Sequence, residues 1–133
     1  MDKRKSKGYT LIEILLVLMI MNMTSILLLP KLITTYENIM FDKQIEYIQM
    51  LLYDAKINSY FQKKKYVIRI YENSIEYQDQ IYEFQGHFEA KQNYTIYYNE
   101  KGNVNRAQTL EFRNRNKEKK IVIWLGGGLS GTK

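Results

Sequence analysis

The feature that most restricts how this chain can fold is an apolar run of 19 residues, Leu11–Leu29, close to the N-terminus. A membrane-spanning helix needs about 20 mostly apolar residues, so the run is long enough to cross a bilayer. Four basic residues precede it, Lys3, Arg4, Lys5 and Lys7. Basic residues beside a spanning helix stay on the cytoplasmic side. We therefore expect a single-pass protein of the cell membrane, with its N-terminus in the cytoplasm and the rest of the chain outside.

The position of a small residue relative to the apolar run argues against an ordinary secretory signal. Such a signal is cut at small residues that follow its apolar run. Here the run ends in L-L-L-P-K-L (27–32), where there is no small-residue cleavage site. Gly8 lies in front of the run instead. Cleavage between Gly8 and Tyr9 would remove the basic leader and retain the apolar helix.

The segment K-G-Y-T-L-I-E, residues 7–13, resembles the processing motif of type IV prepilins and pseudopilins. The resemblance implies that a membrane-embedded prepilin peptidase cuts after Gly8 and N-methylates Tyr9. It also implies that Glu13 is the glutamate used in filament assembly and that Pro30 is the family's recurrent helix proline. The first residue of the mature chain is usually Phe in this family, and Tyr9 is a mild departure.

Glu13 is the only acidic side chain in the apolar run. A carboxylate inside a bilayer helix costs roughly 2.5–3.5 kcal/mol on insertion scales, so a partner is expected. Cleavage would supply the α-ammonium of Tyr9, which is four residues away and shares a helix face with Glu13. In a filament, the partner would be the amine of a neighbouring subunit. The alternative is a simple membrane anchor with a chance Glu near the interface.

Pro30 follows the apolar run and lacks the N–H that an α-helix needs. We expect a helix kink there, the alternative being that Pro30 ends the spanning helix. Apolar residues recur beyond it at steps of three and four, which predicts one long helix from Thr10 to about Tyr60. The residues of that apolar pattern are Leu32, Tyr36, Ile39, Met40, Ile48, Leu51, Leu52 and Ala55.

The rest of the chain has the pattern of short strands. Candidate strands cover 66–71, 75–77, 81–84, 94–98, 110–113 and 121–125, and turns are expected near Asn73, at 85–87 and at 99–103. We therefore predict an α+β, type IV pilin-like fold: a long N-terminal helix, its first half transmembrane, packed on a small antiparallel β-sheet. The expected parts are a cleaved leader (1–8), the transmembrane and assembly helix (9–30), its amphipathic continuation (31–62) and the β-sheet part (63–133).

Three C-terminal segments narrow the resemblance. They are Y-N-E-K-G-N-V (98–104), T-L-E-F (109–112) and I-V-I-W-L-G-G-G (121–128). Together they are similar to the D-type minor competence pseudopilins of Gram-positive bacteria and, more distantly, to the H-type pseudopilins of type II secretion. The family usually has a basic residue after the final glycines, where this chain has Leu129.

This resemblance implies a minor pseudopilin, a structural subunit of an envelope-spanning competence pseudopilus needed for uptake of transforming DNA. The implied partners are the major and other minor pseudopilins, the prepilin peptidase, and the inner-membrane assembly platform with its cytoplasmic ATPase. After cleavage the subunit would lie in a filament at the cell surface. Two alternatives stay open: a tip subunit that binds DNA directly, and a minor pseudopilin of a type II-like protein secretion system.

The formal net charge is +6, and it is unevenly placed. Residues 99–133 carry eight basic and three acidic groups, whereas residues 9–98 carry eight basic and ten acidic groups. The basic residues of segment 113–120 could contact DNA phosphates without reading sequence, with Tyr94, Tyr97 and Tyr98 stacking on bases. These candidates for DNA contact are Arg113, Arg115, Lys117, Lys119 and Lys120. The alternative, which we favour, is a charged hairpin loop with the tyrosines packed on the sheet.

No residue pattern points to catalysis. His87 is the only histidine and falls in an expected turn, and there is no cysteine. A general base needs positioned partners, and the sequence offers none for His87. We interpret Gly126–Gly128 as a strand-ending turn or tail rather than as a phosphate-binding loop. We therefore expect no enzyme, no metal and no cofactor.

Overall fold

The computed structural model describes residues 9–126 and 129–130. Its single helix among these residues, α1, runs through Leu11–Gln62 and continues through Pro30. This confirms the long helix that the apolar pattern predicts. The chain divides into two compact units, with the boundary after Tyr36, and each unit is described by itself below.

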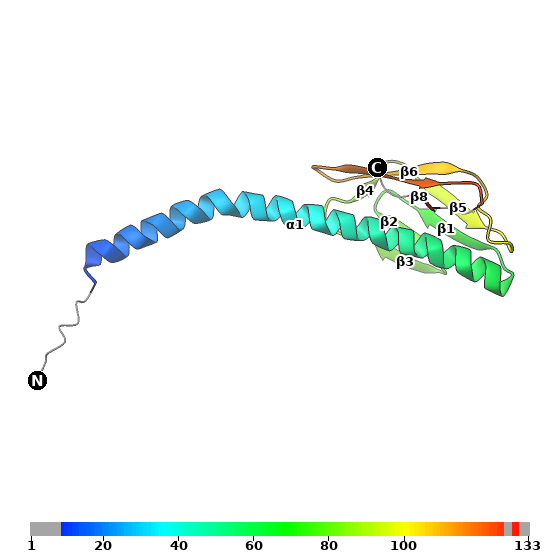
Figure 1. Cartoon of the computed structure of the whole chain (residues 1–133), viewed down its shortest axis with the longest axis horizontal. Helices are drawn as coiled ribbons and strands as arrows, with labels where there is room; N and C mark the ends of the chain where they lie inside the picture. The colour runs from blue at the N-terminus through cyan, green and yellow to red at the C-terminus, as the bar shows by residue number, and fades with distance from the viewer. Residues whose placement is uncertain (1–8, 127–128, 131–133) are drawn as a thin grey trace, which may run out of the picture. The chain divides into compact units, whose positions relative to one another are not determined.

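The first unit consists, in its described residues, of the apolar start of α1 (Figure 1). Its large apolar side chains, from Leu11 to Leu29, are exposed. Among the described residues, α1 is the one helix that is long and apolar enough to cross a membrane.

The second unit contains the rest of α1, and one face of the helix is buried there. The buried residues recur at steps of three and four: Phe41, Ile45, Ile48, Leu51, Leu52, Ala55 and Ser59. The sequence prediction was wrong for the start of this face, because Ile39 is 53% exposed and Phe41 and Ile45 are buried instead. Apolar residues lie on both sides of this stretch of helix, so periodicity alone does not fix which side meets the sheets.

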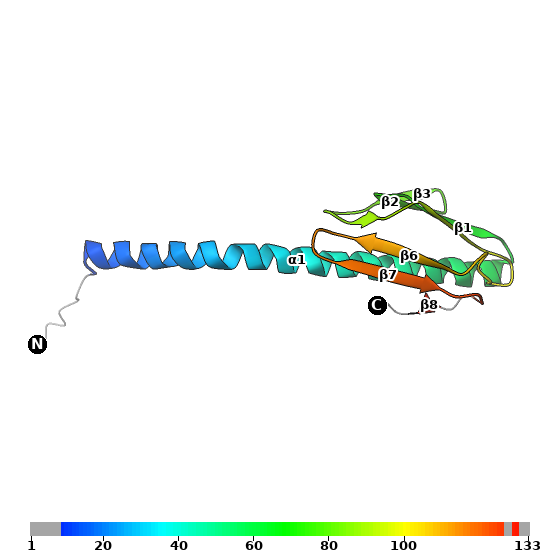
Figure 2. The ribbon, with the colours of Figure 1, turned by 90° about the horizontal axis from the view of Figure 1, so that it is seen from above.

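The strands of the second unit form two antiparallel sheets beside α1 (Figures 1 and 2). Sheet A has the order β3-β2-β1-β5, and sheet B has the order β4-β6-β7-β8. The strands of sheet A are β1 (Tyr66–Ile70), β2 (Ser74–Tyr77), β3 (Gln80–Glu83) and β5 (Tyr94–Tyr98). The strands of sheet B are β4 (Glu89–Ala90), β6 (Gln108–Arg113), β7 (Glu118–Ile123) and β8 (Leu129–Ser130).

The arrangement confirms the predicted α+β, pilin-like architecture and most of the predicted strands. The β1–β2 hairpin turns at 71–74, where the Tyr71 N–H donates to the Ser74 carbonyl at 2.8 Å. The predicted strand 121–125 is shifted, because β7 begins at Glu118 and ends at Ile123. Trp124 and Leu125 lie beyond that end and are exposed. The sequence did not predict β4 or β8, which have two residues each.

The hydrophobic core lies between α1 and the inner faces of both sheets. Phe88, from the loop before β4, is central to it. Its ring centroid lies 5.1 Å from that of Phe41 on α1, 4.7 Å from that of Phe84 and 5.3 Å from that of Phe112 on β6. Aromatic pairs at such distances add about 0.5–1.5 kcal/mol each beyond the area that they bury. The core therefore joins the helix to both sheets.

Candidate functional site

The N-terminus of α1 is built around a contact between Thr10 and Glu13. The Thr10 backbone N–H and hydroxyl donate to the Glu13 carboxylate at 2.7 Å and 2.9 Å. In return, the Glu13 backbone N–H donates to the Thr10 hydroxyl at 3.4 Å. Because α1 begins at Leu11, Thr10 is its N-cap and Glu13 its third residue, which is the reciprocal arrangement called a capping box. The carboxylate thus satisfies backbone and hydroxyl donors of its own helix.

Sequence reasoning found Glu13 but missed Thr10. The signal was present, since T-L-I-E matches the pattern of Thr and Glu three residues apart that precedes an apolar helix. The capping box also gives Glu13 a partner inside its own chain before any neighbour arrives.

Polar side chains further along the apolar run are satisfied locally. The Thr24 and Ser25 hydroxyls both donate to the Met21 carbonyl, at 2.9 Å and 2.8 Å. Unpaired polar groups are costly in hydrocarbon, so these bonds make the segment more compatible with a bilayer. The Thr34 hydroxyl donates to the Pro30 carbonyl at 3.0 Å. The kink expected at Pro30 stays a prediction.

The first predicted processing residue, Gly8, lies outside the described residues. Tyr9 precedes the helix and is 84% exposed. A side chain with so much free surface presents no obstacle to a peptidase acting on the bond before it.

Comparison with known protein families identifies this same segment. Residues 3–29 match the family model described as the prokaryotic N-terminal methylation motif. The chain carries a prepilin-type N-terminus. The match covers the basic leader, Glu13 and the apolar run, and it indicates a subunit of the type IV pilin or pseudopilin class.

The prepilin motif implies processing by a prepilin peptidase and assembly with other pilins. Together with the apolar helix α1, it fits a membrane-anchored, pilin-like protein. Comparison with curated proteins found no match to the chain. Comparison with solved structures also found no match.

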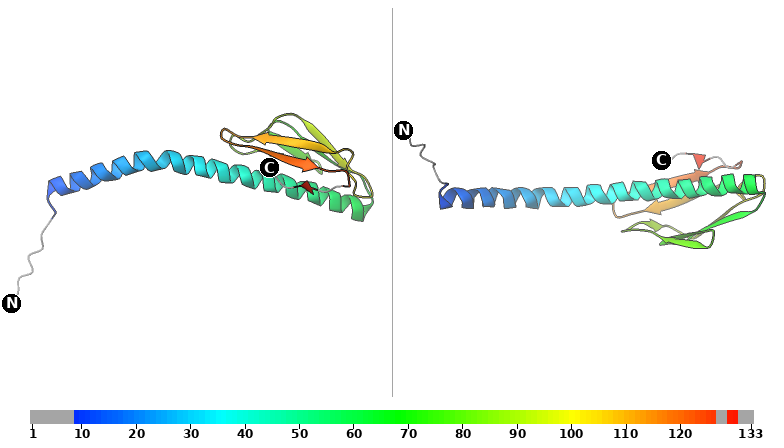
Figure 3. Two further views of the ribbon diagram at one scale, coloured as in Figure 1. Left: turned by 45° about the horizontal axis from the view of Figure 1, so that its top comes forward. Right: turned by 90° about the horizontal axis from the view of Figure 1, so that it is seen from below.

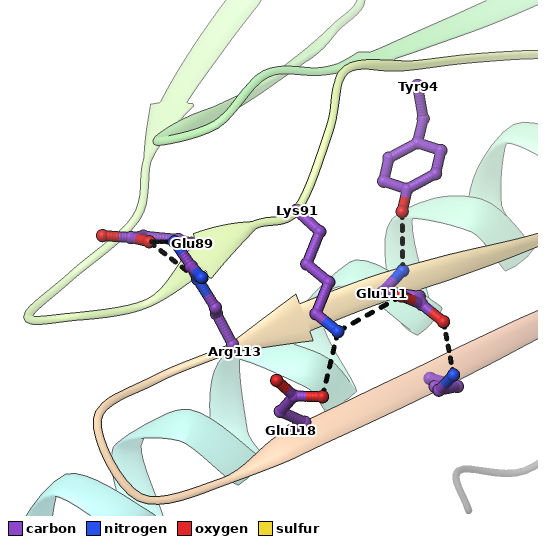
Figure 4. A network of polar contacts seen from close by, with 7 residues as sticks. Glu89, Lys91, Tyr94, Glu111, Arg113 and Glu118 are labelled. Carbon is purple, nitrogen blue, oxygen red and sulfur yellow. Dashed lines mark hydrogen bonds and ion pairs between the residues drawn. The ribbon is translucent and has the colours of Figure 1, made fainter.

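The second candidate site, the basic segment 113–120, forms the tip and flanks of the β6–β7 hairpin. On its outer side, Arg113 pairs with Glu89 of β4 at 3.0 Å, and Lys120 pairs with Glu111 across the hairpin. Figure 4 shows Lys91 between two carboxylates, Glu118 at 3.0 Å and the same Glu111 at 3.4 Å. Hydrogen bonds from Lys120 and from Lys91 lower the pKa of the Glu111 carboxyl.

On its other side, the hairpin is held to α1. Lys119 and Lys117 lie 3.0 Å and 3.3 Å from the two carboxylate oxygens of Asp42, and Arg115 lies 3.9 Å from Glu37. All five basic residues proposed for DNA contact therefore have carboxylate partners within the domain. DNA binding by this segment stays a prediction, but it would have to compete with these ion pairs.

The three tyrosines proposed to stack on bases differ in accessibility. Tyr94 and Tyr98 are buried, so their rings are not available for stacking in the folded domain. The Tyr94 hydroxyl accepts a hydrogen bond from the Glu111 N–H at 2.8 Å, which joins sheet A to sheet B (Figure 4). Tyr97 is half-buried, and the Lys65 ammonium lies 3.8 Å from its ring centroid.

The remaining candidates show no grouping typical of catalysis. His87 is exposed in the turn after Gly86, as the sequence predicts. Gly126 has a positive φ of 96° after β7, whereas Gly127 and Gly128 lie outside the described residues. No cluster of three or more His, Asp or Glu side chains suited to a metal occurs in the described part of the chain.

Proposed function

We propose that this chain is a minor pseudopilin, a structural subunit of an envelope-spanning competence pseudopilus needed for uptake of transforming DNA. The observation that carries the proposal is the prepilin motif with Glu13 held at the start of an exposed apolar helix. The competence assignment is supported by the resemblance of residues 98–104, 109–112 and 121–128 to D-type subunits. The role is one of assembly, and no catalytic step is assigned to the chain.

The capping box suggests how processing and assembly are coupled. In the precursor, the Glu13 carboxylate is occupied by donors of Thr10. Cleavage after Gly8 frees an α-ammonium on Tyr9 in each subunit. A charged donor makes a hydrogen bond roughly twice as strong as a neutral one, so a neighbour's ammonium competes well with the Thr10 hydroxyl. Glu13 then pairs between subunits, away from water.

The proposed processing and assembly also define where the subunit lies and which proteins it contacts. Before assembly the subunit is a single-pass protein of the cell membrane. Afterwards it lies in a surface filament with the major and other minor pseudopilins. The prepilin peptidase acts first, and the assembly platform with its cytoplasmic ATPase then drives insertion into the filament.

The proposal is tested by replacing Glu13 in cells. Removing one member of a buried ion pair costs about 3–5 kcal/mol, so Glu13→Ala is expected to be inserted and cleaved but absent from sheared filaments. Glu46→Gln is the matched control, because Glu46 lies outside the apolar run in an exposed pair with Lys43. Normal incorporation of Glu13→Ala into filaments would contradict the assembly role.

Deletion of the chain separates DNA uptake from secretion. We expect transformation to be lost and to be restored by the Glu46→Gln chain but not by the Glu13→Ala chain. Intact transformation together with loss of an exported protein would instead support the secretion alternative.

A further inference from the structure

Five basic side chains of the second unit, which form no ion pair among the described residues, lie at one end of that unit. Lys63, Lys64 and Lys65 directly follow α1 and are exposed. Lys101 and Arg106 lie in and after the turn that follows β5, and both are exposed. Within residues 9–126 and 129–130, none of these five forms an ion pair, in contrast to the five basic residues of segment 113–120.

Contacts place the segments that carry these five cations side by side. Gly102 packs against the last turns of α1, since a Cβ at that position would lie 3.5 Å from the Cβ of Tyr60. The Lys65 ammonium lies over the Tyr97 ring. The Asn105 N–H donates to the Tyr97 carbonyl at 3.0 Å, which brings Arg106 beside the same strand. Figures 1 and 3 show the loop after β5 next to the C-terminal end of α1.

Exposed aromatic rings accompany these cations. Phe61 is 75% exposed, and its ring centroid lies 5.7 Å from that of Tyr60. The Lys63 ammonium lies 4.2 Å from the centroid of the Tyr60 ring. We call this set the basic–aromatic patch: Tyr60, Phe61, Lys63, Lys64, Lys65, Tyr97, Lys101 and Arg106. Glu100, beside Lys101, is the carboxylate in the same turn.

The chemistry of the patch matches one class of ligand. Sites for single-stranded nucleic acid combine cations that track the backbone phosphates with exposed rings on which bases stack. Phosphates that bind here would displace no internal ion pair, whereas binding at segment 113–120 would break several. A polyanion without bases would use the lysines but not Phe61.

We propose that the basic–aromatic patch binds single-stranded nucleic acid without sequence preference. The proposal deepens the proposed function, and its role in DNA uptake rests on that function. It moves direct DNA contact from the hairpin tip of segment 113–120 to the C-terminal end of α1. The lysines and Arg106 hold phosphates, and Phe61 stacks on a base.

Binding is measured with the full chain in neutral detergent micelles, using the fluorescence anisotropy of a short labelled oligonucleotide of single-stranded DNA. The test variant is K63Q/K64Q/K65Q, and the matched control is R113Q/R115Q/K117Q, which removes the same charge from the paired segment. We expect the test variant to weaken binding at least about tenfold and to reduce the salt slope by about 2, as three lost phosphate contacts predict. The control should stay within about twofold of the unchanged chain, since its residues contact no phosphate in this scheme.

A second variant tests the stacking. Phe61→Ala should weaken binding of the single strand about fivefold or more, because stacking on one base is worth about 1–3 kcal/mol. It should leave the binding of inorganic polyphosphate unchanged. Absence of binding at low salt, equal loss in the charge control, or binding of polyphosphate as tight as that of the single strand would each overturn the proposal.

Failure here is distinguishable from failure of the proposed function. If K63Q/K64Q/K65Q binds DNA normally while Glu13→Ala still blocks assembly and transformation, the patch is wrong and the pseudopilin role stands. Thermal unfolding followed by circular dichroism checks that each variant is folded.

Discussion

The backbone N–H of Thr10 donates a 2.7 Å hydrogen bond to the carboxylate of Glu13. The acid for which we propose an assembly role is therefore also part of the N-terminal cap of its own helix. A carboxylate near a helix N-terminus is stabilised by the unpaired N–H groups and the helix dipole. This local partner lowers the cost of holding Glu13 in an apolar segment.

The first prediction concerns that cap. Thr10→Ala removes the hydroxyl contacts and should destabilise the first turn of α1 by about 1 kcal/mol. The Glu13 and Ile14 N–H groups donate to Thr10, so their amide hydrogen exchange, measured on the full chain in micelles, should become about fivefold faster, the equivalent of that energy. Thr10→Ser keeps the hydroxyl and should exchange as the unchanged chain does. Equal rates for the Ala and Ser variants would show that the hydroxyl is not part of the cap.

The contact between the β6–β7 hairpin and α1 should make the stability of the folded chain depend on pH. Burial raises the pKa of the Asp42 carboxyl, but the hydrogen bonds and positive charges of Lys119 and Lys117 together outweigh burial, and the pKa is lowered overall. A folded-state pKa below the unfolded value of about 3.9 gives stability that is present above that pH. The stability is lost as pH falls through the folded pKa.

Asp42→Asn should therefore lower Tm most near neutral pH, and its difference from the unchanged chain should shrink below about pH 4, where the native carboxyl itself becomes neutral. Thermal unfolding of the full chain across pH measures this difference. Glu46→Gln, in an exposed pair, should have a much smaller effect, because such pairs are worth about 0–1 kcal/mol. A Tm difference for Asp42→Asn that is the same at every pH would rule out the ion pair as its cause.

A third prediction contrasts two buried tyrosines. The Tyr98 hydroxyl is buried without a hydrogen-bond partner among the described residues, and burial raises its pKa to about 12. The Tyr94 hydroxyl accepts the Glu111 N–H. Tyr98→Phe removes an unsatisfied polar group and should raise the free energy of unfolding by about 1 kcal/mol.

Tyr94→Phe leaves the Glu111 N–H unpaired and should lower the free energy of unfolding by about 1–3 kcal/mol. Chemical denaturation of both variants gives the two signs directly. A loss of stability in Tyr98→Phe equal to that in Tyr94→Phe would show that the Tyr98 hydroxyl is bonded after all.

The long helix and the β-rich remainder could be predicted because each leaves a local pattern. The apolar run and the spacing of three and four define α1, and alternating or continuous apolar runs define β1, β5 and β6. The strands β4 and β8 are too short to leave such a pattern. The buried face was misplaced at Ile39 because its position depends on the sheets that cover it.

The candidate sites also differ in whether they depend on neighbouring residues or on residues far apart in the sequence. Gly8 and Glu13 can be identified as candidate site residues because they belong to a motif of neighbouring residues. The same motif contains Thr10 and therefore also predicts the N-terminal cap. The pairing of Lys117 and Lys119 with Asp42 could not be predicted in this way, because the partners are far apart in sequence and meet only in the folded domain. For the same reason, the sequence does not distinguish the paired basic residues of segment 113–120 from Lys63, Lys64 and Lys65, which have no ion pair in the described part of the chain.

The most direct test of the central claim is mass spectrometry of the chain's N-terminus, isolated from cell envelopes that contain an active prepilin peptidase. The processing scheme predicts a mature chain that begins at N-methylated Tyr9, and a chain that keeps residues 1–8 when the peptidase is absent. A chain that still begins at Met1, or that keeps residues 1–8 in the presence of the peptidase, would contradict it.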